Sequence, residues 1–173
     1  FRRVLFRSVA KIDRFGNFVW ANKSVSWITY MHSVEVLSDG VITVAGTSRG
    51  LHTALGDFEF SMNDPNSDHG FVAQLDQSGA FTNAVKYTEV NGYFRMNASI
   101  FNGPELTQIS GNRINLTGIY HAVWPATIGG RLVNHQHAED TLFHIKFAPN
   151  LSVNSVIIGR DGNHANEAEI EGF

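Results

Sequence analysis

Apolar and polar residues alternate over short stretches of this chain, and turn residues separate the stretches. Val34 and Val36 would point to the same side of an extended chain, and Ile42 and Val44 repeat the pattern on the next stretch. A period of two is typical of a half-buried β-strand. No stretch of a dozen residues shows the period of about 3.6 that an amphipathic helix requires. The pattern therefore predicts an all-β fold of short antiparallel strands.

Turn residues mark where pairs of predicted strands are joined. The strands of the first unit are predicted at residues 9–13, 18–22, 34–37 and 41–47. Gly16 and Asn17 can take the positive φ angles of a tight turn between the first two strands. Asp39 and Gly40 form the tip of the hairpin between the last two. We expect these four strands to make one unit, followed by an irregular polar linker over residues 46–68.

This unit recurs along the chain. Its three markers are Val9-Ala10-Lys11-Ile12-Asp13, Phe71-Val72-Ala73-Gln74-Leu75-Asp76 and Phe143-His144-Ile145-Lys146-Phe147. Val9 lies 63 residues before Val72 (72 − 9), and Phe71 lies 72 residues before Phe143 (143 − 71). Gly46 and Gly118 are also 72 residues apart (118 − 46). Two landmarks with one offset predict a repeat protein, whose units bury their apolar faces against one another.

The repeat divides the chain into residues 9–70, residues 71–142 and a truncated third copy over residues 143–173. The nine extra residues of the second copy (72 − 63) fall within residues 88–104, where we expect an inserted loop. Residues 1–8 differ from the rest, because residues 3–8 read as the translation of a common sequencing-adapter stretch. We interpret residues 1–8 as an assembly artefact and the chain as part of a longer reading frame. The alternative is a genuine basic strand.

Composition limits the classes of function. The sequence is 43% hydrophobic and 12% aromatic, as in a folded chain, and its net charge is −3. No cluster of Lys and Arg follows residue 8, so the sequence gives no basis for binding nucleic acid. No apolar run is long enough to cross a bilayer, and no signal peptide is visible. The absence of Cys excludes disulfides and any Cys-based zinc site.

The repeat resembles a known family. Residues 71–79, with residues 9–13 and 16–21 in the preceding copy, resemble the bacterial β-propeller repeats called SBBP. That family joins a phenylalanine-valine-alanine-lysine-leucine-aspartate strand to a glycine turn and to a strand ending in tryptophan-alanine. Residues 39–47 match its following aspartate-glycine and valine-threonine-glycine piece. The resemblance implies a partial β-propeller of about two and a half four-stranded antiparallel blades.

The resemblance also implies a function. Such repeats occur in large exported or cell-surface bacterial proteins, so the chain is expected to be a non-catalytic scaffold, or an adhesion surface for a protein or carbohydrate ligand. The remaining blades of the same polypeptide would be its partners. An incomplete ring should expose apolar sheet faces, so we expect the chain alone to associate.

The alternative is a piece of a propeller enzyme. Residues 10–13, Gly16 and Trp20 resemble in part the docking motif of quinone-dependent dehydrogenases. Phe15 and Ser78 stand where that motif has threonine, and Asn83 stands where the second copy would need tryptophan. A carbohydrate-active propeller enzyme is the other possibility in this class. No nucleophile elbow, phosphate loop or paired carboxylates mark a catalytic site, so no catalytic residue is predicted.

Three histidines are the candidates for a metal site. His135 and His137 share one face of an extended segment, and His121 or Asp140 would supply a third ligand for zinc or copper. The alternative is that they are polar residues of a linker. Residues 63–68 are rich in oxygen ligands but lack the spacing of a calcium loop. No cofactor is therefore predicted, although zinc and calcium stay open.

Aromatic residues in two predicted loops are the candidates for ligand binding. Trp124 follows the second hairpin, and Tyr93, Phe94 and Arg95 lie in the inserted loop. Aromatic and arginine side chains are common in binding hot spots. Trp20 is expected to pack in the core instead.

A last set of residues recurs at equivalent turns: Asp13, Gly16, Asp39, Gly40, Asp76 and Gly79. A catalytic residue is needed once, whereas a turn must be capped in every unit. Recurrence therefore favours a structural role for these six residues.

Overall fold

The computed structural model describes residues 2–5, 8–61, 68–90, 105–109, 113–122, 126–133 and 139–160. Every regular element in these ranges is a β-strand, which confirms the predicted all-β class. In chain order the strands are β1 (Arg2–Leu5), β2 (Ser8–Ile12), β3 (Phe18–Val25), β4 (Ile28–Val36), β5 (Ile42–Arg49), β6 (His52–Leu55), β7 (Phe58–Ser61), β8 (Asp68–Leu75), β9 (Phe81–Lys86), β10 (Thr88–Val90), β11 (Glu105–Ile109), β12 (Arg113–Ala122), β13 (Ala126–Ile128), β14 (Arg131–Val133), β15 (Glu139–Phe147) and β16 (Val153–Arg160).

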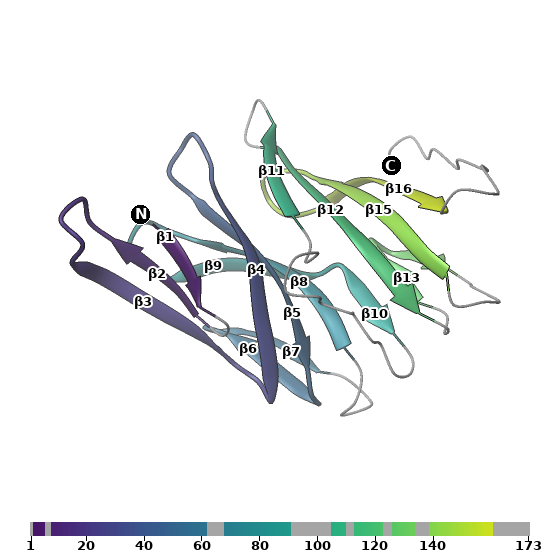
Figure 1. Ribbon diagram of the computed structural model, residues 1–173, viewed down its shortest axis with the longest axis horizontal. Helices are drawn as coiled ribbons and strands as arrows, with labels where there is room; N and C mark the ends of the chain where they lie inside the picture. Colours follow the sequence, from purple (N-terminus) through teal and green to yellow (C-terminus); the bar gives the residue numbers. More distant parts are fainter. Residues whose placement is uncertain are drawn as a thin grey trace.

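The strands form antiparallel sheets that stand side by side in chain order (Figure 1). The first sheet has the order β1-β2-β3-β6-β7, the central sheet β4-β5-β8-β9, and the last sheet β11-β12-β15-β16. A small sheet, β10-β13-β14, combines β10, which follows the central sheet in the sequence, with β13 and β14, which lie between β12 and β15 of the last sheet in the sequence. The central and last sheets have four strands each, as predicted, and no described sheet closes on itself.

The strands of one sequence repeat do not form one sheet, and this expectation was wrong. β2 and β3 lie in the first sheet, whereas β4 and β5 pair with β8 and β9 of the following repeat. β5 is thus a central strand, paired with β4 on one edge and with β8 on the other. Its residues 42 to 48 are all buried because neighbouring sheets cover both faces. The central and last sheets therefore each combine two strands from one repeat with two from the next.

The predicted linker contains a β-hairpin in both copies, which the sequence pattern did not indicate. The turn between β6 and β7 uses Gly56, with φ 61°, and the turn between β13 and β14 uses Gly129 and Gly130. β6 pairs with β3 of the first sheet, and β13 pairs with β10, which directly follows the central sheet. Main-chain hydrogen bonds thus tie each sheet to its predecessor.

The turn that closes each sheet keeps one backbone geometry in three copies. Asp13 N donates to Asn17 O at 2.9 Å, Asp76 N to Ala80 O at 3.0 Å, and Ala148 N to Ser152 O at 2.8 Å. In the first two copies the carboxylates of Asp13 and Asp76 also accept main-chain N–H groups. In the third, the Asn150 side chain accepts from Ser152 N instead. Gly16 has φ 89°, but Asn17 does not take the positive φ expected of it.

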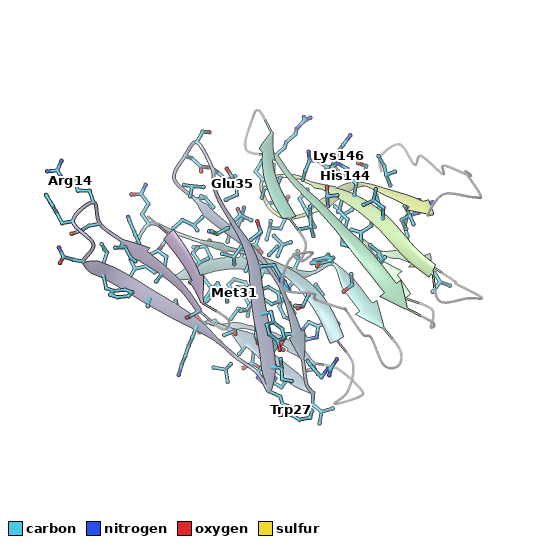
Figure 2. The ribbon with its side chains drawn as sticks, viewed as in Figure 1. Arg14, Trp27, Met31, Glu35, His144 and Lys146 are labelled. Atoms are coloured by element: carbon cyan, nitrogen blue, oxygen red, sulfur yellow. The ribbon has the colours of Figure 1, made fainter. Side chains whose placement is uncertain are left out.

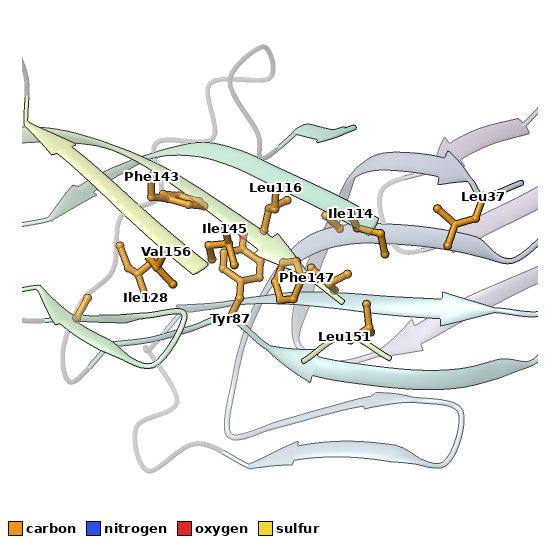
Figure 3. Packing of buried hydrophobic residues seen from close by; sticks show 13 residues of the cluster. Leu37, Tyr87, Ile114, Leu116, Ile128, Phe143, Ile145, Phe147, Leu151 and Val156 are labelled. Carbon is orange, nitrogen blue, oxygen red and sulfur yellow. The ribbon is translucent and has the colours of Figure 1, made fainter. Parts of the chain in front are cut away.

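The central sheet buries both faces. On one side, Phe71, Ala73 and Leu75 of β8 pack in a cluster with Val9 of β2 and Leu55 of β6. The other side packs against the last sheet, as Figure 3 shows. That second cluster contains Leu37, Ala45, Val72, Tyr87, Ile114, Leu116, Ala126, Ile128, Phe143, Ile145, Phe147, Leu151 and Val156. Stacking against neighbours therefore supplies the core that one sheet cannot form alone.

Candidate functional site

The residues predicted to bind a ligand or a metal lie mostly outside the described part of the chain. These are Tyr93, Phe94, Arg95, Trp124, His135 and His137. The backbone of His121 is described, on β12, and it lies opposite Asp140 of β15. Those are the two residues considered as a third metal ligand. Among the residues that the structure describes, no group of three or more His, Cys, Asp or Glu could hold a metal ion.

A buried group of hydroxyls joins β4, β5 and β6. Ser48 Oγ lies 2.8 Å from Ser26 Oγ and 2.7 Å from Thr53 Oγ1. Ser26 Oγ also donates to the carbonyl of Arg49 at 2.8 Å, and Thr29 Oγ1 lies 3.2 Å from Ser48 Oγ. Thr29, Ser48 and Thr53 are at most 2% exposed. Ser26 is half-buried, and the hydroxyls of this group bond to one another across β4, β5 and β6, which stabilises the packing of these strands.

The joint between the first and central sheets is built by β3 and the turn after β8. Trp20 Nε1 donates to the carbonyl of Gln77 at 2.9 Å, and Asn22 Nδ2 donates to the carbonyl of Gly79 at 2.8 Å. Gly79 has φ 92°, and a Cβ there would lie 2.5 Å from Trp20 Cδ2. The indole therefore lies directly on the glycine.

The joint between the central and last sheets repeats this arrangement with other side chains. Gln74 Nε2 donates to the carbonyl of Pro149 at 2.9 Å, and Asn83 Nδ2 donates to the carbonyl of Asn150 at 2.8 Å. Asn83 is the counterpart of Trp20 (83 − 20 = 63). The tryptophan missing from the second copy is thus replaced by a residue that donates to the same turn.

The outer face of the first sheet keeps the residues of a buried interface. Its Ala10, Ile12, Phe18 and Ala21 correspond to residues 73, 75, 81 and 84 at the offset of 63, which are Ala, Leu, Phe and Ala. Those four belong to or pack against the cluster between the first and central sheets. Phe18, by contrast, is 69% exposed, and Val25 on the same strand is 58% exposed. This face is apolar, and it is exposed at Phe18 and Val25 but not at Ala10, which is 1% exposed.

The outer face of the last sheet carries polar side chains at positions where the central sheet is mostly apolar, although Leu142 on the same face is apolar and 53% exposed. Arg113, Thr117, His144 and Lys146 stand where the central sheet has residues 41, 45, 72 and 74, which are Val, Ala, Val and Gln. His144 and Lys146 lie at the opposite end of the molecule from Arg14, which precedes Gly16 (Figure 2). His144 Nδ1 lies 2.9 Å from Thr117 Oγ1, and burial together with Lys146 lowers the pKa of His144. The two ends of the stack therefore differ chemically.

Trp27 is an exposed aromatic residue of the first half of the chain. It lies in the short connection between β3 and β4 and is 62% exposed (Figure 2). Leu51 and Tyr30 are also exposed, at 53% and 40%. Trp27, Tyr30 and Leu51 therefore lie outside the core.

His32 makes stability depend on pH. Its Nε2 lies 2.9 Å from Thr47 Oγ1, and burial lowers its pKa from the ordinary 6.5. The folded chain then binds a proton less readily than the unfolded chain, so this contribution is present above pH 6.5 and is lost as pH falls through the folded pKa. We expect the urea midpoint to fall between about pH 7.5 and about pH 5.5, and to fall less in His32→Gln. His52→Gln is the control, because that ring is half exposed. An unchanged fall in His32→Gln would contradict the assignment.

Comparison with known proteins finds a similar solved structure whose function is unknown. No protein family model matches the sequence, and no curated protein matches it. A protein of unknown function from Bacteroides caccae, solved by crystallography, aligns with 98% of this chain over 73% of its own length, at 9% identity and a TM-score of 0.46. The described residues contain no helix that is long and apolar enough to span a membrane.

Proposed function

We propose that this chain is a non-catalytic scaffold segment of an exported or cell-surface bacterial repeat protein. Its sheets would act as blades of a β-propeller, and further blades of the same polypeptide would cover the open apolar face. Protein or carbohydrate ligands would bind to the loops at the sheet ends. No metal or other cofactor is required for this role. The exported location rests on the SBBP resemblance alone.

The open face of the first sheet is the observation that carries this proposal. Ala10, Ile12 and Phe18 repeat residues that the central sheet uses to pack against its neighbour. Of these three, Phe18 is 69% exposed, whereas Ala10 is only 1% exposed. Burying one large apolar side chain such as Phe18 contributes about 1.5–3 kcal/mol, so the sheet gains from a partner at this position. A face with the composition of a packed interface marks an interaction surface. The side chains of Thr29, Ser48 and Thr53, by contrast, are buried and are inaccessible to a substrate.

The proposal predicts that the chain alone associates through this face. We expect wild-type chain to show a concentration-dependent increase in sedimentation coefficient, and Phe18→Asp to weaken the association at least about tenfold. A buried carboxylate in an apolar contact carries a large desolvation cost. Leu132→Asp is the matched control, because Leu132 is 73% exposed and Phe18 is 69% exposed.

Two results would contradict the proposal. One is a wild-type chain that stays monomeric at all concentrations reached. The other is an equal effect of Phe18→Asp and Leu132→Asp, which would mean that association follows general surface hydrophobicity and not the outer face of the first sheet.

A further inference from the structure

The two joints between neighbouring sheets are filled by residue pairs of complementary size. At the first joint the large Trp20 lies on Gly79, which has no side chain. At the second joint Asn83 takes the position of Trp20, and Leu151 takes the position of Gly79 (151 − 79 = 72). Leu151 is 1% exposed and belongs to the cluster of the second joint. A large donor thus faces glycine, and a small donor faces leucine.

The conformation of Leu151 supports this pairing. It has φ 63° and is the one non-glycine residue of the described chain with positive φ. Left-handed backbone is unfavourable for a leucine, whose Cβ approaches the following carbonyl. The turn geometry requires positive φ at this position, since Gly79 has φ 92° and Gly16 has φ 89°. A leucine is held there because its side chain fills the space that the indole of Trp20 fills at the first joint.

Exchanging the pairs would produce two different defects. Trp20 opposite a leucine would place two large side chains in the space of one, since even a Cβ at Gly79 is too close to the indole. Asn83 opposite a glycine would leave a cavity in a buried joint. The pair at each joint therefore decides which turn can dock on which sheet.

The first and last sheets each carry, on the outer side, one residue of such a pair. At the first sheet the free half is Gly16, and nothing lies within 4 Å of the position of a Cβ there. At the last sheet the free half is Ser155, the counterpart of Asn83 (155 − 83 = 72). Ser155 Oγ is buried and has no hydrogen-bond partner within the described residues. Gly16 opposite Ser155 would bring together a glycine and a small residue and leave a cavity.

We infer that the outer face of the first sheet docks a β-sheet that carries tryptophan, or another large side chain with an N–H donor, at the position of Trp20. This inference rests on the proposed function. The donor would pack on Gly16 and bond to the carbonyl of Arg14, the counterpart of Gln77 (77 − 14 = 63). The last sheet of this chain is not that partner, because it offers Ser155 and a face with Thr117 and His144 where the packed face has Ala45 and Val72.

A double-mutant cycle at the first joint tests the pairing rule. We expect Trp20→Asn and Gly79→Leu each to lower the thermal midpoint, and the double variant to recover at least half of the summed loss. A double variant whose loss equals the sum of the two single losses would overturn the inference. The proposed function would survive that result if Phe18→Asp still dissociated the chain, so the two failures are distinguishable.

A tandem protein tests the outer face. Two full copies of the chain are joined by a flexible Gly-Ser linker, and the thermal midpoint and indole emission are compared with those of the single chain at a dilution where single chains are monomeric. Every tandem carries Phe18→Asp in the first copy, which prevents its two first-sheet faces from associating with each other, and we expect the tandem without further change to melt like the single chain. Ser155→Trp in the first copy should raise the midpoint and shift the indole emission to the blue, and Gly16→Leu in the second copy should abolish both changes.

Three outcomes of the tandem experiment would overturn the inference. The unmodified tandem could dock as well as the Ser155→Trp tandem, which would show that the pair sizes do not matter. The Gly16→Leu substitution could fail to reverse the gain, which would place the indole elsewhere. Finally, an absence of docking in every tandem would show that a large donor does not suffice for this face.

Discussion

Replacing Gly46 by alanine should destabilise the chain by about 2–3 kcal/mol, near the upper end for overpacking a core. Gly46 lies on β5 in the centre of the molecule, opposite Phe71 of β8. A Cβ there would lie 2.5 Å from Phe71 Cζ and 2.5 Å from the carbonyl oxygen of Tyr30. The ring is fully buried and the carbonyl belongs to the neighbouring strand β4, so neither can move away cheaply.

Gly159 supplies the matched control for this prediction. It lies on β16, and nothing lies within 4 Å of the position of a Cβ there. Gly159→Ala should therefore change stability by less than about 0.5 kcal/mol. Urea denaturation of both variants, followed by far-ultraviolet circular dichroism, measures the difference. Equal stability of the two variants would show that the ring of Phe71 does not lie over Gly46.

The repeat landmarks in the sequence mark the same contact in two sheets. Gly46 faces Phe71, and Gly118 faces Phe143, where a Cβ would again lie 2.5 Å from the ring. A side chain at either glycine would overlap the phenylalanine ring. The glycine and the phenylalanine therefore keep the same separation in both copies, while the residues around them differ. The 72-residue offset could be predicted for this reason, whereas the all-β class followed from the alternation of apolar and polar residues.

The partners of the strands could not be predicted in the same way. Alternation shows that a stretch is extended, but it does not show which strand lies beside it. β5 pairs with β8 of the following repeat. Both faces of β5 are buried, but only because the neighbouring sheets stack on it, which the pattern of one strand does not show. β6 and β13 were missed because strands of four and three residues are too short for a periodic signal.

The sites show the same limit more strongly. Read position by position, Asn83 looks like the loss of a tryptophan, and Leu151 looks like the loss of a glycine. Together they form a joint that performs the same task as Trp20 and Gly79. Size compensation between residues that are 59 and 68 positions apart (79 − 20 and 151 − 83) can be recognised only once the contact between them is known. The polar residues around His144 on the outer face of the last sheet could likewise be recognised only by comparing them with the packed face of the central sheet.

Replacing Gly79 by alanine should also destabilise the chain by about 3 kcal/mol, through two separate causes. The first is backbone strain, because Gly79 has φ 92° and alanine avoids that region. The second is overlap with Trp20, whose Cδ2, Cε3 and Cε2 would lie 2.5, 2.8 and 2.9 Å from the new Cβ. The indole cannot retreat without losing its hydrogen bond to the carbonyl of Gln77.

Gly16 separates the two causes. Its φ is 89°, almost equal to that of Gly79, but nothing lies within 4 Å of the position of a Cβ there. Gly16→Ala should therefore lose about 1 kcal/mol from strain alone, and the remaining difference of about 2 kcal/mol measures the packing of the indole at the joint. Trp20→Ala introduced together with Gly79→Ala should bring the effect of the alanine at Gly79 close to that at Gly16. If Gly79→Ala and Gly16→Ala cost the same in the wild-type background, the joint does not depend on the contact between Trp20 and Gly79, and the first and central sheets are held together by the apolar cluster and the β6 hairpin alone.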